Sequence, residues 1–165
     1  MKKILLLSDT HSHIDDTILK YAAMADEVWH AGDIGDLKVI DALKEQSNLK
    51  AVYGNIDNDK ARLEFPEDLF FTCENVPVFM THIGGYPGRY KPRVKTLLQT
   101  HKPALYICGH SHILKVMFDK KNNLLHMNPG AAGKHGFHKV RTMLRFHIDG
   151  KDIKNLEIIE IETRK

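Results

Sequence analysis

The stretch His30-Ala31-Gly32-Asp33-Ile34-Gly35-Asp36 places a carboxylate between two glycines where an apolar run ends. That run, Val28-Trp29, is typical of a short buried strand, and a helical pattern follows the stretch. Glycines at such a strand end let backbone or a ligand come close to Asp33. Taken alone, the stretch is explained more simply as a strand-to-helix turn with a capping Asp. The other strand ends of the chain therefore decide what Asp33 does.

Strands and helices alternate through the first third of the chain. An apolar run over residues 2–7 ends at Ser8-Asp9-Thr10-His11 and predicts a strand buried on both faces. A helix capped by Asp15 or Asp16 should follow, up to about Met24. This β-α-β-α-β order predicts a parallel sheet with right-handed crossovers. The remaining predicted elements of this part are strands over 27–30 and 49–53 and a helix over 37–46.

The order of predicted elements differs in the second half of the chain, where most strands follow one another without a helix between them. One helix is predicted near residues 93–100, with Pro92 in its first turn after a loop over 86–90. Asn128-Pro129-Gly130 is interpreted as a turn that shapes a wall of the site. Hairpins late in the chain predict a second, more mixed sheet. The predicted strands cover residues 69–74, 76–81, 104–108, 114–119, 124–128, 140–148 and 153–161.

Length and composition predict one globular domain over residues 1–165, without a repeat or linker. A net charge of +3 without a long basic block argues against a nucleic-acid partner. Cys73 and Cys108 lack a CxxC spacing and predict no structural disulfide, as suits the cytoplasm. The N-terminal apolar stretch is short for a signal peptide, and no segment approaches the ~20 apolar residues of a membrane span. We expect a cytoplasmic protein with no membrane partner. The sequence does not fix the oligomeric state, although two-sheet folds with an exposed edge often pair as homodimers.

Side chains that can bind metals follow five of the predicted strands. Ligands in open α/β sheets gather outside the carboxyl ends of the strands. Seven nitrogen and oxygen donors at one such edge are too many for one four-coordinate zinc ion, and they suit two metal ions that share a ligand. The chain has 11 histidines, and histidine is the commonest metal ligand. The seven donors are Asp9, His11, Asp33, Asn55, His82, His110 and His112.

Electrostatics indicates which ligand the two metals share. Two dications about 3.5–4 Å apart repel by roughly 17–19 kcal/mol at an effective dielectric of 20. Only an anion between them offsets this repulsion, and Asp33 is the natural candidate because its flanking glycines leave room on either side. A bridging hydroxide would add to the effect. With Asp9 as the second carboxylate the site stays strongly positive, so it fits a phosphate as substrate and a metal-bound water as nucleophile.

The motifs at these strand ends resemble those of the calcineurin-like metallophosphoesterases, especially their compact bacterial and archaeal phosphodiesterases. The resemblance covers residues 3–130 and lies in the order of the motifs rather than in any one of them. It implies an α/β fold, a four-layer α/β/β/α sandwich of two mixed sheets flanked by helices. The family usually has Gly-His where this chain has Thr81-His82. The motifs are Asp9-Thr10-His11, Gly32-Asp33, Gly54-Asn55, His82 and Gly109-His110-Ser111-His112.

The resemblance also implies how the metals are held. Of the two divalent ions, Mn²⁺ is favoured, with Ni²⁺, Fe²⁺, Co²⁺ or Zn²⁺ as alternatives. The resemblance implies catalytic roles for Asp33, Asn55 and His82. The first metal would be bound by Asp9, His11, Asp33 and His112, and the second by Asp33, Asn55, His82 and His110.

One position departs from the family pattern. Many relatives have a histidine directly after the Asn of the third motif, which is thought to protonate the leaving group or hold the phosphate. This chain has Ile56 there, so the residue that would protonate the leaving group is not identified. His13, His135 and Asp57 are candidate substitutes. Asp57 is more simply interpreted as a residue that orients a ligand.

The remaining basic residues have simpler interpretations. Arg89, Lys91 and Arg93 can contact a diester substrate, but a solvated basic face is the more ordinary explanation. His30 is predicted to be packed beside Trp29. Structural positions are expected for four other histidines, the last three on hairpin strands: His101, His126, His138 and His147.

We therefore predict a cytoplasmic, dinuclear-metal-dependent phosphodiesterase that hydrolyses a small phosphodiester by attack of a metal-bridging hydroxide. Two alternatives remain at this point. The first is a non-catalytic protein-binding scaffold on the same fold, as in the retromer subunit that resembles this family. The second is a nuclease, which the modest charge disfavours.

Overall fold

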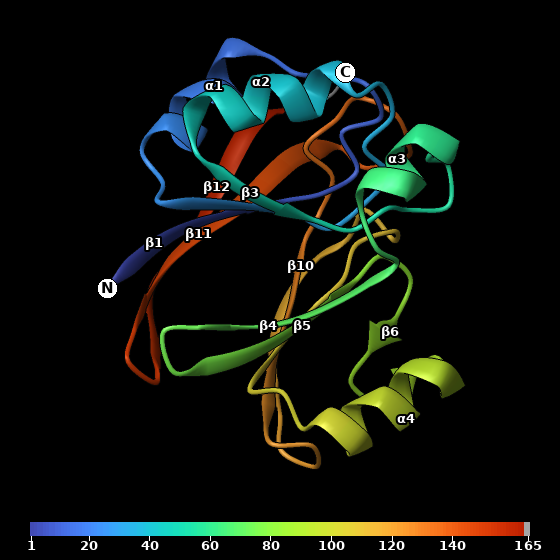
Figure 1. Ribbon diagram of the computed structural model, residues 1–165, viewed down its shortest axis with the longest axis vertical. Helices are drawn as coiled ribbons and strands as arrows, with labels where there is room; N and C mark the ends of the chain where they lie inside the picture. The colour runs from blue at the N-terminus through green and yellow to red at the C-terminus, as the bar shows by residue number, and fades with distance from the viewer. Residues whose placement is uncertain (164–165) are drawn as a thin grey trace.

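Two five-stranded β-sheets stack against each other in the computed structural model, which describes residues 1–163 (Figure 1). Each sheet combines parallel and antiparallel pairs, so both are mixed. In spatial order, the first sheet contains β12 (Asp152–Thr163), β11 (Val140–Asp149), β1 (Lys2–Leu7), β2 (Glu27–His30) and β3 (Asn48–Ala51). The second contains β4 (Asp68–Cys73), β5 (Val76–Thr81), β8 (Leu105–Ile107), β10 (Leu124–Pro129) and β9 (Leu114–Asp119).

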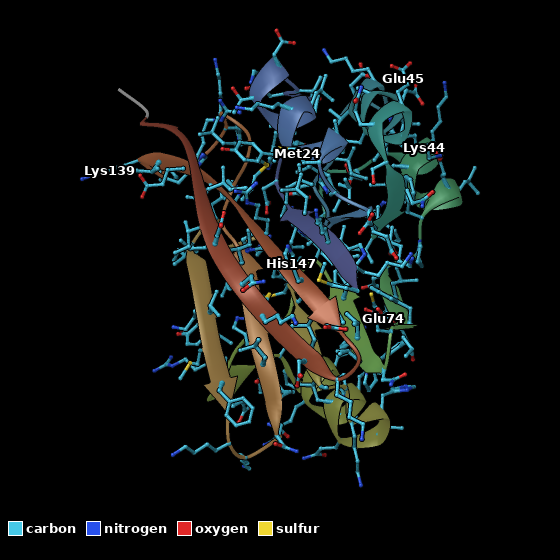
Figure 2. All side chains as sticks on the ribbon, turned by 90° about the vertical axis from the view of Figure 1, so that its left-hand side faces the viewer. Met24, Lys44, Glu45, Glu74, Lys139 and His147 are labelled. Atoms are coloured by element: carbon cyan, nitrogen blue, oxygen red, sulfur yellow. The ribbon has the colours of Figure 1, made fainter. Side chains whose placement is uncertain are left out.

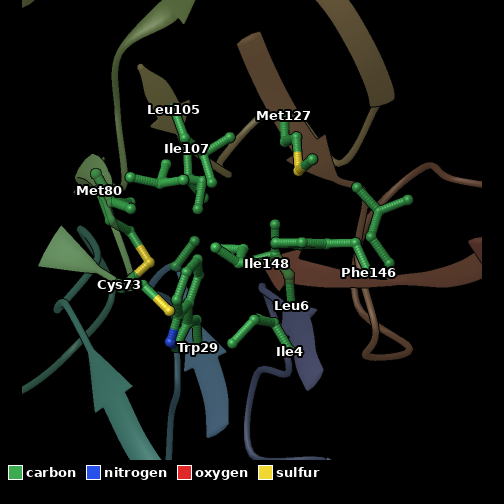
Figure 3. Close-up of a cluster of buried hydrophobic side chains, with 14 of the residues drawn as sticks. Ile4, Leu6, Trp29, Cys73, Met80, Leu105, Ile107, Met127, Phe146 and Ile148 are labelled. Atoms are coloured by element: carbon green, nitrogen blue, oxygen red, sulfur yellow. The ribbon is translucent and has the colours of Figure 1, made fainter. Parts of the chain in front are cut away.

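The side chains of each central strand alternate between two hydrophobic cores. In β1, Ile4 and Leu6 enter the core between the sheets, while Leu5 and Leu7 pack under helices on the other face. Both faces are buried, which is why the run is apolar throughout. Trp29 and Phe146 meet in the core between the sheets, with ring centroids 5.8 Å apart (Figure 3).

Helices cover the outer face of each sheet. On the first sheet, α1 (Asp16–Ala23) and α2 (Lys38–Gln46) bury residues one turn apart, such as Ile18 and Ala22. Asp15 caps α1 by accepting a hydrogen bond from the Ile18 N–H. On the second sheet, α4 (Pro92–His101) packs on the β5 and β8 side chains. The order helix, sheet, sheet, helix confirms the predicted four-layer sandwich.

The last hairpin joins a different sheet from the one expected. β11 pairs antiparallel with β1, so β11 and β12 extend the first sheet and make it mixed. Figure 2 shows this hairpin along one side of the molecule, with His147 on β11. Alternation predicts a strand but not its partner, because pairing depends on long-range packing.

Local differences from the predicted elements occur near turns. A short helix, α3 (Asp59–Glu64), was not predicted, and the expected loop over 86–90 holds part of the hairpin β6 (Gly85–Tyr86) and β7 (Arg89–Tyr90). Asn128 and Pro129 pair with β9, so the turn begins only at Gly130, where φ is +74°. Within residues 1–163, no helix is long and apolar enough to cross a membrane.

Candidate metal centre

The seven predicted metal-binding side chains lie on loops that leave the carboxyl ends of β1, β2, β3, β5 and β8. Five of them have left-handed backbone, with φ between +43° and +72°. Asp and His enter this region more readily than most residues, and its occupation at a loop cluster often marks a functional site. The five are Asp9, His11, Asp33, His110 and His112.

Asp9 lies at the bottom of the centre and is fully buried. Its Oδ2 accepts hydrogen bonds from the Ser8 hydroxyl, at 2.6 Å, and from the His110 N–H, at 3.1 Å. Its Oδ1 lies 3.1 Å from Nε2 of His112. Burial raises the pKa of Asp9, but contacts with His11 and His112 outweigh that cost and hold the pKa well below its ordinary value. Asp9 is therefore an anion inside the protein.

Asp33 lies between two imidazoles. Its Oδ2 is 3.2 Å from Nε2 of His82 and 3.4 Å from Nε2 of His11, and its Oδ1 accepts a hydrogen bond from the Ile56 N–H. Burial raises the pKa of Asp33, but the close contacts with His11 and His82 outweigh that cost and hold the pKa well below its ordinary value. Gly54 makes room for this carboxylate, because a Cβ there would lie 2.2 Å from Asp33 Oδ1.

The side chains form two groups that can each hold a metal ion. One contains Asp9, His11 and His112, and the other contains Asp33, His82 and His110; in each, the ligand atoms lie within 4.8 Å of one another. Asp33 also faces His11 of the first group, which is the position of a shared ligand. Asn55 belongs beside the second group, since its Oδ1 is 3.1 Å from Nδ1 of His110.

Unpartnered buried atoms show that this donor set fits cations. Among the described residues, Asp9 Oδ1, His11 Nε2 and His82 Nε2 are buried without a hydrogen-bond partner. Such atoms are rare in folded proteins. The Nδ1 of His82 donates to the Ala31 carbonyl at 2.8 Å, which leaves its Nε2 as a metal-binding lone pair. Asp33 and Asp9 raise the pKa of His11 to about 9, so a proton competes with a metal ion for its Nε2.

Asp57 organises the loops around the centre. Its carboxylate accepts hydrogen bonds from the N–H groups of Ile34, Gly35 and Gly54, at 2.7–3.2 Å. It therefore ties the loop after β2, which carries Asp33, to the loop after β3, which carries Asn55. Asp57 contacts the backbone of the loops that carry two candidate ligands and not a ligand side chain, so the prediction that it orients a ligand stays a prediction.

A groove of about 500 Å³ opens over the centre, and only some of the candidate proton donors line it. His135 lines it and stacks on the His11 ring, with centroids 4.6 Å apart. Ile56 lines it too, with its side chain 46% exposed. His13 is not among the lining residues and contacts Asp15 at 2.9 Å instead. Of the three substitutes, His135 is the one positioned to reach a substrate.

Other basic residues divide between structural and site positions. His30 is packed as predicted: its Nδ1 accepts from the Gly32 N–H, and burial lowers its pKa to about 4. Arg93 forms an ion pair with Asp68. His138, predicted on a hairpin strand, lies instead in the loop before β11, with its ring 5.2 Å from His112. In the sequence, His138 lies three residues after His135 in a stretch that contains glycine, and this could have indicated a loop position near the site.

Known proteins share sequence and fold with this chain. Residues 1–151 match the sequence family described as "Calcineurin-like phosphoesterase superfamily domain". A probable metallophosphoesterase of Methanocaldococcus jannaschii is 24% identical over 132 residues, which cover 76% of this chain and 66% of that protein.

Two solved structures share the fold. An archaeal phosphodiesterase superimposes with a TM-score of 0.74 and 21% identity, covering 96% of this chain and 99% of that one. Vps29 of Entamoeba histolytica in complex with Zn²⁺ superimposes with a TM-score of 0.72 and 16% identity, covering 97% and 99%.

Proposed function

The chain belongs to the calcineurin-like phosphoesterase superfamily, and from this we propose that it is a phosphodiesterase that depends on two divalent metal ions. The observation that carries the proposal is that Nε2 of His11 and Nε2 of His82 lie beside Asp33 Oδ2 and that these two atoms and Asp9 Oδ1 are buried without a hydrogen-bond partner among the described residues. The first ion would be held by Asp9, His11, Asp33 and His112, and the second by Asp33, Asn55, His82 and His110.

In this proposal the protein residues hold the metal ions, set the net charge of the centre and place a proton donor beside it. Bound metal ions would polarise the phosphoryl oxygens and lower the pKa of a coordinated water. Asp9 and Asp33 carry about two negative charges, so a centre holding two dications keeps a net positive charge that attracts a phosphodiester. Mn²⁺ suits this mixture of imidazole and oxygen donors. His135 is placed to give a proton to the leaving oxygen.

The proposal is tested with bis(p-nitrophenyl) phosphate, with EDTA-treated protein before and after addition of Mn²⁺. We expect turnover only with metal, and a loss of at least 10²-fold in Asp33→Asn because the shared anion is gone. Asp41→Asn, on the exposed face of α2, is the matched control and should retain activity. Full turnover in Asp33→Asn, or none in the wild type with metal, would overturn the proposal.

A protein-binding scaffold is the second candidate, favoured by Ile56 in the place of a histidine. The Vps29 relative was solved with Zn²⁺, so metal content does not separate a scaffold from an enzyme. Turnover does. A protein that binds Mn²⁺ stoichiometrically yet hydrolyses no ester would support the scaffold.

A further inference from the structure

A second cavity, of about 540 Å³, adjoins the groove over the metal centre. The two share His110, Ser111 and Ile113, so a molecule bound at His110 can extend into both. The cavity size suits a small-molecule site. Other parts of its wall come from the β6–β7 hairpin and from β9 and β10, which carry no candidate metal ligand, and from the loops next to His82 and His110.

Three cations from two distant parts of the chain line this cavity. Arg89 and Lys91 come from the β6–β7 hairpin and the residues after it, and Lys115 comes from β9. Across residues 1–163, no carboxylate lies within 4 Å of their charged groups. Arg93, by contrast, is neutralised by Asp68. Unpaired cations around one concave site create a positive potential that attracts anions.

The cavity also offers an aromatic face and a polar floor. Nζ of Lys115 lies 4.6 Å from the centroid of the Tyr86 ring, so the charge is held over a flat surface. On the floor, His126 is 1% exposed, and its Nδ1 has no hydrogen-bond partner among the described residues. The Asn128 amide donates to the Gly109 carbonyl and to the Ser111 hydroxyl, both at 3.1 Å. A flat group and an anion both find complementary surface here.

We propose that this cavity binds one arm of the phosphodiester substrate, and that this arm is nucleotide-like and carries a further phosphate. The inference rests on the proposed function, because the scissile phosphate is taken to lie at the metals beside His110. An uncharged arm would give Arg89, Lys91 and Lys115 no anionic partner. An arm with a second phosphate pairs with them, while its flat base packs on Tyr86.

Two chromogenic esters that differ only in that phosphate test the inference: thymidine 5′-(p-nitrophenyl phosphate) with and without a 3′-phosphate. The measured quantity is the ratio of their kcat/KM values, so each protein is its own reference. We expect the 3′-phosphate to raise kcat/KM at least tenfold in the wild type. The ratio should fall below twofold in the triple variant Arg89→Gln, Lys91→Gln, Lys115→Gln.

Two further proteins separate local from general charge effects. Lys20→Gln, Lys121→Gln, Lys151→Gln removes the same charge at exposed positions outside both cavities and should keep the tenfold ratio. If the first triple variant does not fold, the exposed single variant Lys91→Gln should still lower the ratio severalfold. An equal loss in the two triple variants would overturn the assignment.

The outcomes distinguish the inference from the function on which it rests. Turnover of bis(p-nitrophenyl) phosphate with a wild-type ratio near one would overturn the subsite and leave the phosphodiesterase intact. No turnover of any ester would overturn the phosphodiesterase itself. A tenfold preference, per bond, for a decathymidylate over a dinucleotide would overturn the assignment to a small diester.

Discussion

The two carboxylate oxygens of Asp33 have different neighbours, and this difference makes residue 54 critical. Oδ2 faces the imidazoles of His11 and His82, while Oδ1 accepts a backbone hydrogen bond from Ile56. Oδ1 is also the atom that a methyl group on Gly54 would meet, at 2.2 Å. The carboxylate therefore keeps this position only while residue 54 has no side chain.

Gly54→Ala should accordingly displace Asp33 and lower metal-dependent turnover by at least 10²-fold. The reason is steric, because no positive φ at Gly54 adds strain. Gly150→Ala, at a φ of +60° with open space around it, controls for the general effect of adding a methyl group and should retain turnover. Steady-state assays with bis(p-nitrophenyl) phosphate would show the difference. Equal activity in the two variants would refute the steric argument.

The role proposed for His135 is tested through the leaving group. A general acid contributes about 10²–10⁴-fold where the leaving oxygen needs a proton, and little where it leaves as a stable anion. His135→Ala should therefore slow hydrolysis of a phenyl ester by at least 10²-fold, but that of the matching p-nitrophenyl ester much less. His147→Ala, on β11, is the control. A uniform loss with both esters would assign His135 to packing on His11 instead.

His126 should make folding sensitive to acid. Burial lowers its pKa to about 4, so between about pH 6.5 and 4 the unfolded chain binds a proton that the folded chain excludes. Stability therefore falls as the pH is lowered through this range. In His126→Leu, the loss of unfolding free energy between pH 7 and pH 5 should be smaller by about 2 kcal/mol. Urea titrations at both pH values measure this, and an unchanged pH dependence would contradict it.

Among the elements, the loops after β2 and β3 depend on one carboxylate. Asp57 accepts three backbone N–H bonds with two oxygens, whereas an amide has a single acceptor oxygen. Asp57→Asn should lower the unfolding free energy of the metal-free protein by about 1–3 kcal/mol and weaken metal binding. Asp41→Asn should change it by less than about 0.5 kcal/mol. Urea unfolding and Mn²⁺ titration of both proteins provide the test, and equal effects would exclude the proposed coupling.

Elements with a strong local signal were predictable, and those without one were not. The continuous apolar run over residues 2–7 indicated β1, and the Asp15 cap and Pro92 marked the starts of α1 and α4. The six-residue α3 lacks a sustained apolar stripe and was missed. The clustering of metal-binding residues could be expected from topology alone, because side chains after parallel strands meet at one edge. The cavity lined by Arg89 and Lys115 could not, since the two belong to different hairpins and nothing in their spacing joins them.

At the scale of the whole molecule, metal binding should couple to stability. A ligand at 100 times its Kd stabilises the folded state by about 2.7 kcal/mol, and 1 kcal/mol shifts Tm by about 2–4 °C for a chain of this length. Two Mn²⁺ ions should therefore raise the Tm of the EDTA-treated protein by about 10–20 °C. Calorimetry should show a much smaller rise in Asp33→Asn, and an equal rise would place the metals elsewhere.

Only part of the strand pairing in the first sheet could be predicted from the sequence. The β-α-β-α-β order indicated the parallel pairs of β1, β2 and β3. The antiparallel pairing of β1 with β11 joins residues about 140 positions apart, as in Lys2 with Ile148, and no local pattern encodes it. That pairing brings β11 next to β1 and so places Phe146 in the same core as Trp29.

The left-handed backbone at five candidate metal-binding residues has a cost in folding stability. A residue with a side chain costs roughly 1 kcal/mol more than glycine in this conformation, and five such positions approach the net stability of a small domain. Glycine would relieve this cost at each position but would also remove the candidate ligand, so the proposed metal centre requires this part of the backbone to stay strained.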